Sequence, residues 1–266
     1  MAIFDNGNGK LHYQLDGADD APLLVLSNSL GTTLDMWVPQ MPALLEHFRV
    51  LRYDTRGHGG SPVTPGPYRM DDLGQDVLAL LDALNIDQAY FCGISMGGHT
   101  GLWLGVQAGA RMRGIAVCNS AAKIGTAQAW QERAATVRSQ GAAAMQALAD
   151  SAPGRWFTPG FTQAHPDVVQ RAQAWIAGIA PEGYAACCEA LATSDLRDSI
   201  SRIGVPTLLL AGADDPVTTV ADAQAMQDSI AGSSLAIVPA SLLSNLEALQ
   251  AFEQAVLDFL AHAAKA

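Results

Sequence analysis

Positive charge is scarce in this chain. It has 15 lysine and arginine residues against 26 aspartate and glutamate residues, which gives a formal net charge of −11. Binding to nucleic acid or to an anionic membrane surface depends on clustered lysine and arginine side chains, so we expect neither kind of partner. A substrate that carries negative charge would need a cation placed locally in its binding site.

Cysteines and long apolar runs are also few. The four cysteines, Cys92, Cys118, Cys187 and Cys188, have no Cys-x-x-Cys spacing, and two of them lie in apolar runs, so we expect structural thiols and no metal or cofactor. No run approaches membrane-spanning length, and the N-terminal MAIFDNGNGKL has neither a basic start nor an apolar segment. We therefore expect a soluble, cytoplasmic protein.

Short runs rich in valine, leucine and isoleucine alternate with longer stretches of helical periodicity. This alternation is typical of an α/β protein whose mostly parallel sheet is covered by helices on both faces. With 266 residues, of which 49% are hydrophobic, the chain can bury one sizeable core. The runs predict strands at residues 23–29, 48–54, 89–95, 114–120, 206–213 and 234–240.

Two stretches have the period of an amphipathic helix. In MDDLGQDVLALLDAL, apolar residues recur on one face, and Asp71 or Asp72 is a candidate cap near its start. The apolar residues of that face are Leu73, Val77, Leu80, Leu81 and Leu84. The C-terminal LEALQAFEQAVLDFLAHAAKA has a similar pattern.

Residues 121–193 interrupt the alternation. This region has an alanine-rich helical pattern, broken by turn signals at SAPG and FTPGF, and no convincing strand. Ligands of parallel α/β sheets bind at the carboxyl ends of the strands, so helices inserted between two strands favour a lid over that edge. We expect a core formed by residues 1–120 and 194–266 and a helical lid formed by residues 121–193.

The segment CGISMGGH contains a candidate nucleophile. Gly93-Ile-Ser95-Met-Gly97 fits the pattern G-x-S-x-G between a predicted strand and a predicted helix. In such a turn the serine has a strained backbone and projects at the top of the sheet, and the small residues on either side let the strand and the helix approach. The alternative is a glycine-rich turn whose serine has no chemical role.

A serine nucleophile requires two further features. An oxyanion hole could be formed by the N–H groups of Met96 and of Leu30, since Leu30 lies in the loop SNSLGTT after an earlier strand, although that loop could also be an ordinary turn. An acid should follow the serine at the end of a later strand. LLLAGADDPVTT supplies Asp215 as the better candidate and Asp214 as the alternative, and the one that is not catalytic could cap the next helix.

Together these segments resemble the α/β-hydrolase superfamily over essentially the whole chain, and DTRGHGGS resembles its loop signature, in which His58 would be structural. Within the superfamily the chain is similar to the 3-oxoadipate enol-lactonases. The segments that carry this second resemblance are SNSLGTTLDMW, GISMGG, CNSAAKIGTAQAWQER, LAGADDPVTT and SNLE. The resemblance implies an α/β-hydrolase fold with a helical lid and the hydrolysis of 3-oxoadipate enol-lactone, a small anionic lactone, to 3-oxoadipate in the β-ketoadipate pathway of aromatic catabolism.

At one position the chain departs from this family. The family's catalytic histidine stands two residues before the serine of SN, and carried onto PASLLSN that position is Leu242. The chain has six histidines elsewhere: His12, His47, His58, His99, His165 and His262. None of them is placed by the sequence as a substitute base. Leucine cannot accept a proton, so we expect Ser95 to remain a poor nucleophile and the activity to be severely impaired.

The resemblance also directs attention to the start of the lid, where the substrate carboxylate would need a cation. Trp130 and Arg133 are one helical turn apart, and Arg133 is the first candidate, followed by Arg138. Ser29, beside the expected oxyanion hole, is expected to border the substrate. The alternative is a solvated arginine and a tryptophan buried in the core.

Two other functions stay open at this point. A general carboxylesterase or perhydrolase of the same fold would turn over neutral esters and would not depend on Arg133. A non-catalytic small-molecule binding protein would keep the hydrolase pocket without its base.

Overall fold

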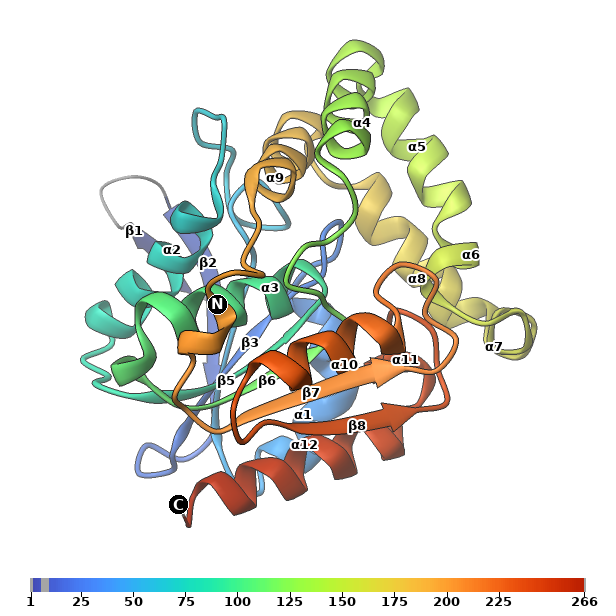
Figure 1. Cartoon of the computed structure of the whole chain (residues 1–266). Helices are drawn as coiled ribbons and strands as arrows, with labels where there is room; N and C mark the ends of the chain where they lie inside the picture. Colours follow the sequence, from blue (N-terminus) through green and yellow to red (C-terminus); the bar gives the residue numbers. More distant parts are fainter. Residues whose placement is uncertain (1, 6–9, 266) are drawn as a thin grey trace.

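In the computed structural model, which describes residues 2–5 and 10–265, an eight-stranded sheet forms the centre of the molecule (Figure 1). The strand order is β1-β2-β4-β3-β5-β6-β7-β8. Strands β1 and β2 are antiparallel to their neighbours, and the pairs from β4 to β8 are parallel. The strands are β1 (Ala2–Asp5), β2 (Lys10–Asp16), β3 (Leu23–Ser27), β4 (Arg49–Tyr53), β5 (Ala89–Ile94), β6 (Met112–Cys118), β7 (Thr207–Gly212) and β8 (Ser234–Val238).

The burial of the strands follows their place in the sheet. Every residue of β3, β5 and β7 is buried, as expected for parallel strands covered on both faces, whereas the edge strand β1 alternates between half-buried and exposed residues. All six strands predicted from the apolar runs are present, with ends that differ by at most two residues. The predicted α/β-hydrolase fold, with a mostly parallel sheet, is confirmed.

Helices cover both faces of this sheet. Helices α3 (Met96–Gln107) and α10 (Val220–Ser229) pack on one face, and α2 (Met70–Ala83) packs on α3. Helix α12 (Leu249–Ala263) lies on the other face, below the sheet in Figure 1, where its Phe252 ring packs 6.2 Å from Trp37 of η1 (Leu34–Gln40). The remaining short helices of the core are α1 (Met41–Leu44), η2 (Gly109–Arg111), η3 (Ile200–Arg202) and α11 (Ser244–Glu247).

Helix α2 buries the apolar face that its sequence predicts. Leu73, Val77, Leu80 and Leu81 are buried. The N-cap residue is Arg69, and of the two aspartates predicted near the cap Asp72 takes part in capping, as the N3 residue of a capping box. Asp72, the third residue of the helix, accepts the Arg69 N–H at 2.7 Å. Asp71 accepts a hydrogen bond from Trp103.

Residues 121–193, all of which the structure describes, contain helices and no strand. They lie between β6 and β7 in the chain, and Figure 1 shows them gathered to one side of the sheet. They are α4 (Ala127–Gln140), α5 (Ala142–Ser151), α6 (Pro153–Trp156), α7 (Pro159–Ala164), α8 (Pro166–Ala177) and α9 (Pro181–Thr193). No helix in the described part of the chain is long and apolar enough to span a membrane.

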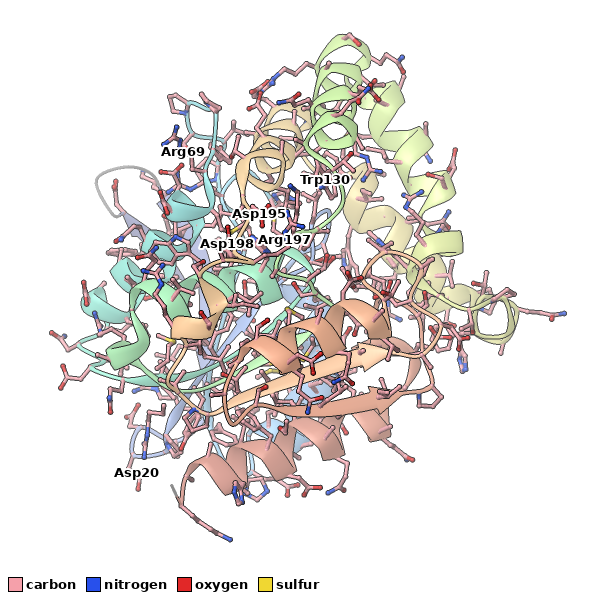
Figure 2. The ribbon with its side chains drawn as sticks, viewed as in Figure 1. Asp20, Arg69, Trp130, Asp195, Arg197 and Asp198 are labelled. Atoms are coloured by element: carbon pink, nitrogen blue, oxygen red, sulfur yellow. The ribbon has the colours of Figure 1, made fainter. Side chains whose placement is uncertain are left out.

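The two connections between these helices and the sheet are joined to each other. The Leu196 N–H donates to the Ala122 carbonyl at 2.9 Å, and Lys123 pairs with Asp195 at 3.1 Å. Asp195 lies just below α9 in Figure 2. The helices therefore leave and re-enter the core at one place.

All four cysteines are buried and free, as the sequence predicted for structural thiols. Cys92 and Cys118 lie on the neighbouring strands β5 and β6, with their sulfur atoms 3.9 Å apart. Burial raises the pKa of the Cys118 and Cys187 thiols well above the ordinary value, so they stay protonated and behave as small apolar side chains.

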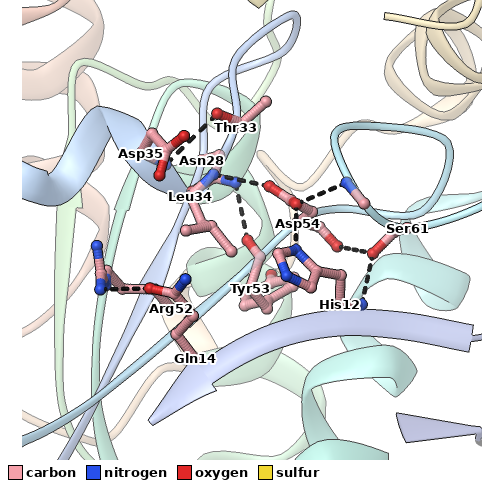
Figure 3. Close-up of polar contacts among 11 residues, drawn as sticks. His12, Gln14, Asn28, Thr33, Leu34, Asp35, Arg52, Tyr53, Asp54 and Ser61 are labelled. Carbon is pink, nitrogen blue, oxygen red and sulfur yellow. Dashed lines mark hydrogen bonds and ion pairs between the residues drawn. The ribbon is translucent and has the colours of Figure 1, made fainter. Parts of the chain in front are cut away.

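The loop after β3 is held by a buried carboxylate at the end of β4. Asp54 accepts the Leu34 N–H through Oδ1 and the Gly60 N–H through Oδ2, both at 2.8 Å, and its Oδ2 lies 2.7 Å from His12 Nδ1 (Figure 3). Ser61 donates to the Asp54 carbonyl and closes the network. Asp54 thus ties the loop after β3 to the loop after β4.

His58 also contacts the loop after β3. Its Nε2 accepts the Gly31 N–H at 3.2 Å, and its Nδ1 lies 3.4 Å from the Arg56 carbonyl, so the ring is neutral with the proton on Nδ1. Burial lowers the pKa of His58 from 6.5 to about 4, and burial also lowers the pKa of His99. Protonation of His58 would point a second N–H at the Gly31 N–H.

This arrangement predicts that stability falls in mild acid. Because the pKa of His58 is lower in the folded chain, the unfolded chain binds the proton first, so the contribution is complete above about pH 6.5 and is lost as the pH falls toward 4. The loss for a shift of this size is on the order of 3 kcal/mol. Urea unfolding between pH 4.5 and 7.5 should show a shallower dependence on pH in His58→Gln, and an unchanged slope would contradict this account.

Candidate active site

Ser95 forms the turn between β5 and α3. Its φ is +56° and its ψ is −115°, a conformation that a serine adopts only when the surrounding chain imposes it. Its N–H donates to the Cys118 carbonyl at 3.0 Å, and its carbonyl accepts from Ser120 Oγ at 2.8 Å. Both ends of the residue are therefore fixed by the end of β6.

Two glycines allow this turn. A Cβ on Gly93 would lie 2.3 Å from backbone atoms of Gly97, and a Cβ on Gly97 would lie 2.3 Å from the Ser27 carbonyl oxygen. These separations are far below van der Waals contact, so neither position accepts a side chain without movement of the backbone. The close approach brings the N-terminus of α3 against the end of β3.

The two candidate oxyanion-hole residues belong to the two segments that approach each other here. Met96 is the first residue of α3, where N–H groups have no partner within the helix. Leu30 lies in the loop after β3 that the Asp54 network holds, and Ser29 and Leu30 line the same cavity as Ser95. Met96 itself is buried and is not among the cavity-lining residues.

Asp215 lies in the loop after β7 and is buried. Its Oδ1 accepts the N–H groups of Val217 and Thr218, and its Oδ2 accepts Thr218 Oγ1 at 2.7 Å and Asn119 Nδ2 at 3.0 Å. Asp214 is exposed on the surface. Of the two aspartates considered from the sequence, Asp215 is the one that the structure holds in the interior.

Leu242 is buried in the loop after β8 and lines the same cavity as Ser95. The neighbouring residues are tied to the acid loop, because Asn119 Nδ2 also donates to the Ser241 carbonyl at 3.1 Å and Asn119 Oδ1 accepts from Ser244 Oγ. Asn119 has a φ of +44° at the end of β6. One buried side chain thus links the loops that carry Asp215 and Leu242.

The cavity that these loops enclose has a volume of about 180 Å³, which suits a small molecule. Ser95, Ser29, Leu30 and Leu242 come from the sheet side, and the helices α4, α6, α8 and α9 supply most of the opposite side. The residues from those helices are Ala129, Trp130, Arg133, Arg155, Trp156, Ile176 and Tyr184. No acidic side chain and no histidine lines the cavity among the described residues.

The structure separates the two arginines proposed from the sequence. Arg133 lines the cavity, with its guanidinium carbon 4.8 Å from the ring centroid of Trp130 (labelled in Figure 2). Arg138 lies outside the cavity lining, because its guanidinium points to α9 and pairs with Glu182 at 2.8 Å and with Glu189. These carboxylates raise the pKa of Arg138 and satisfy its charge, so it is not available to the cavity.

The histidines lie away from the cavity or are held by other groups. His99 is buried, with Nδ1 2.8 Å from the Ala121 carbonyl and Nε2 2.7 Å from Ser194 Oγ. His12 pairs with Asp54, and His58 accepts the Gly31 N–H. His47, His165 and His262 are exposed on the surface.

Known proteins resemble this chain over nearly its whole length. A family described as alpha/beta hydrolase fold matches residues 22–241. The chain belongs to the alpha/beta hydrolase fold family. It is 51% identical to 3-oxoadipate enol-lactonase 2 of Acinetobacter baylyi, over 92% of this chain and 91% of that protein, and 45% identical to 3-oxoadipate enol-lactonase 1 of the same organism, over 97% and 96%.

A solved structure also supports membership of the alpha/beta hydrolase fold family. The enol-lactonase from Burkholderia xenovorans matches this alpha/beta hydrolase with a TM-score of 0.95 and 44% identity, covering 98% of this chain and 100% of that one. The resemblance to 3-oxoadipate enol-lactonases drawn from the sequence motifs is therefore confirmed at the level of the family.

Arg155 and Tyr184 are among the cavity residues of this alpha/beta hydrolase that were not found from the sequence. Arg155 lies in the four-residue helix α6, and Tyr184 lies in α9. Neither residue stands in one of the family segments that the sequence displays. Only their position on the cavity wall distinguishes them from other residues of the helices.

The contacts of Asp215 predict a structural role that is separate from any chemistry. In Asp215→Ala the Val217 and Thr218 N–H groups and the Asn119 amide lose a buried acceptor, so we expect the free energy of unfolding to fall by about 2–5 kcal/mol. The exposed neighbour Asp214 provides the control. Asp214→Ala should change the free energy of unfolding, measured in urea, by less than about 0.5 kcal/mol. Equal losses in the two variants would contradict the assignment.

Proposed function

We propose that this chain carries the active site of a 3-oxoadipate enol-lactonase in which the base is missing. Ser95 is the nucleophile, the N–H groups of Leu30 and Met96 form the oxyanion hole, and Asp215 is the acid. Leu242 occupies the place of the histidine. The observation that carries this proposal is that Ser95 and Leu242 line one cavity whose described lining contains no histidine.

In the proposed reaction, Ser95 Oγ attacks the lactone carbonyl and the ring C–O bond breaks. The enol oxygen leaves and becomes a ketone after a proton reaches carbon, and water then hydrolyses the acyl-serine to 3-oxoadipate. Both steps need a group that removes a proton, first from Ser95 and then from water. Leu242 can do neither, so turnover should be very slow although the oxyanion hole and the cavity persist.

We further propose that residues 121–193 act as a lid. The support is the position of α4, α6, α8 and α9 on the cavity wall opposite Ser95. A lid at this place excludes water from the lactone and strengthens its interaction with a charged side chain. Arg133, half-buried and stacked on Trp130, is the proposed partner of the substrate carboxylate.

Restoring the base tests the proposal. Leu242→His should raise kcat/KM for 3-oxoadipate enol-lactone by up to about 10⁶-fold, because the serine regains its general base. Adding Ser95→Ala to that variant should remove the gain. Hydrolysis is followed by loss of the lactone chromophore, and folding is checked by circular dichroism.

Two other results would redirect the assignment. A correctly folded Leu242→His variant that hydrolyses neutral acyl esters in preference to the lactone would favour a general esterase. The same variant without any hydrolysis would favour a small-molecule binding protein, a function that Leu242 and the histidine-free cavity also support.

The role of Arg133 has its own test in the Leu242→His background. Arg133→Ala should raise KM for the carboxylate-bearing lactone by about tenfold, since a charge-assisted contact is lost, and should spare neutral esters of similar size. Arg138→Ala should leave KM for the lactone and KM for the neutral esters nearly unchanged, because Arg138 is paired with Glu182 and Glu189. An equal loss on charged and neutral substrates would overturn the role.

A further inference from the structure

The cavity carries more positive charge than one carboxylate needs. Its lining includes two guanidinium groups, Arg133 and Arg155, and no acidic side chain, in a chain whose formal net charge is −11. Among the described residues neither arginine forms an ion pair. Both are half-buried, where unneutralised charge is unfavourable.

The two arginines are anchored to different parts of the wall. Arg133 extends from α4, where it stacks on Trp130 and interacts with the Tyr184 hydroxyl. Arg155 extends from α6, where its Nη1 donates to Ser151 Oγ at 3.1 Å. The two guanidinium groups can therefore contact a ligand at two separate points of the cavity.

The backbone of α6 is fixed to the loop that carries Leu242. The Arg155 carbonyl accepts from Ser241 Oγ at 3.2 Å, and the Trp156 carbonyl accepts the Leu243 N–H at 3.1 Å. These bonds involve the residues on either side of Leu242. Arg155 is thereby held near the loop where the chemistry of the family takes place, while Arg133 is held by α4 and α9.

The two positive charges also act on each other. Burial lowers the pKa of Arg155, and the nearby Arg133 lowers it further. Arg133 and Arg155 both oppose the rise that burial causes in the pKa of Tyr184. A ligand with two negative charges would neutralise both guanidiniums, whereas a ligand with one would leave part of the repulsion in place.

We propose that this cavity is a site for short dicarboxylates and that Arg155 is the specificity-determining residue for the second carboxylate. The proposal rests on the proposed function, in which water converts a lactone with one carboxylate into an open chain with two and releases a proton. The lactone engages one guanidinium through its existing carboxylate. The ring-opened product engages both, so the product binds more tightly than the substrate.

The chain as it stands, with Leu242 in place, permits a direct binding experiment. Isothermal titration compares adipate, a six-carbon dicarboxylate, with hexanoate, which has the same length and one carboxylate. We expect adipate to bind at least about tenfold more tightly. Arg155→Gln should bring the two affinities to within about twofold of each other, and Arg155→Lys, which keeps the charge, should retain most of the preference.

An arginine elsewhere in the helical segment provides the matched control. Arg171 is exposed on α8, lies outside the cavity lining and should be replaceable by glutamine without change in either affinity. Equal affinities for adipate and hexanoate would overturn the proposal. So would an equal loss on both ligands in Arg155→Gln, which indicates that both arginines hold a single carboxylate.

The binding result and the hydrolysis result fail independently. If the dicarboxylate preference depends on Arg155 but the Leu242→His variant hydrolyses no lactone, the dicarboxylate site is supported and the proposed function is contradicted. If that variant hydrolyses the lactone but the chain shows no dicarboxylate preference, the proposed function is supported and the dicarboxylate site is contradicted.

Discussion

The turn at Ser95 is the constraint on which the site depends. Strand β5 passes into helix α3 within one residue, and the backbone of that residue has a φ of +56°. The turn is possible only because Gly93 and Gly97 have no side chain, since an added Cβ at either position would lie 2.3 Å from a backbone atom. The same close approach brings the start of α3 against the end of β3, so the loop that holds Leu30 lies beside Ser95. A packing requirement of the fold therefore sets the geometry of the candidate oxyanion hole.

The opposite side of the site is assembled by polar contacts that do not need a histidine. Asn119 joins the loops after β7 and β8, and the Asp215 carboxylate has four donors without any contribution from residue 242. An apolar side chain at position 242 leaves no donor or acceptor of this network unpaired. Burial of Leu242 removes apolar surface from water and stabilises the loop. The hydrogen bonds around position 242 are therefore complete with leucine there.

The sequence predicted the features that depend on local pattern. The six predicted strands are short runs rich in apolar residues, and the turn at Ser95 has a motif because its strain demands particular residues. The contacts of the helical segment could not be read in this way. Arg138 pairs with Glu182 and Glu189, which lie 44 and 51 residues further along the chain, so nothing local separates it from Arg133. Arg155 reaches the cavity because α6 is tied to the loop after β8, a contact between segments that are 86 residues apart.

We propose that every part of a serine hydrolase site except the base is present in this chain. Labelling of Ser95 by a fluorophosphonate tests this claim without reference to any substrate, because the reagent reports only the nucleophilicity of the serine and its oxyanion hole. Intact-mass spectrometry should show rapid addition of one label to Leu242→His, none in that time to the chain with Leu242, and none when Ser95 is also replaced by alanine. Labelling of the Leu242 chain at a rate equal to that of Leu242→His would contradict the account.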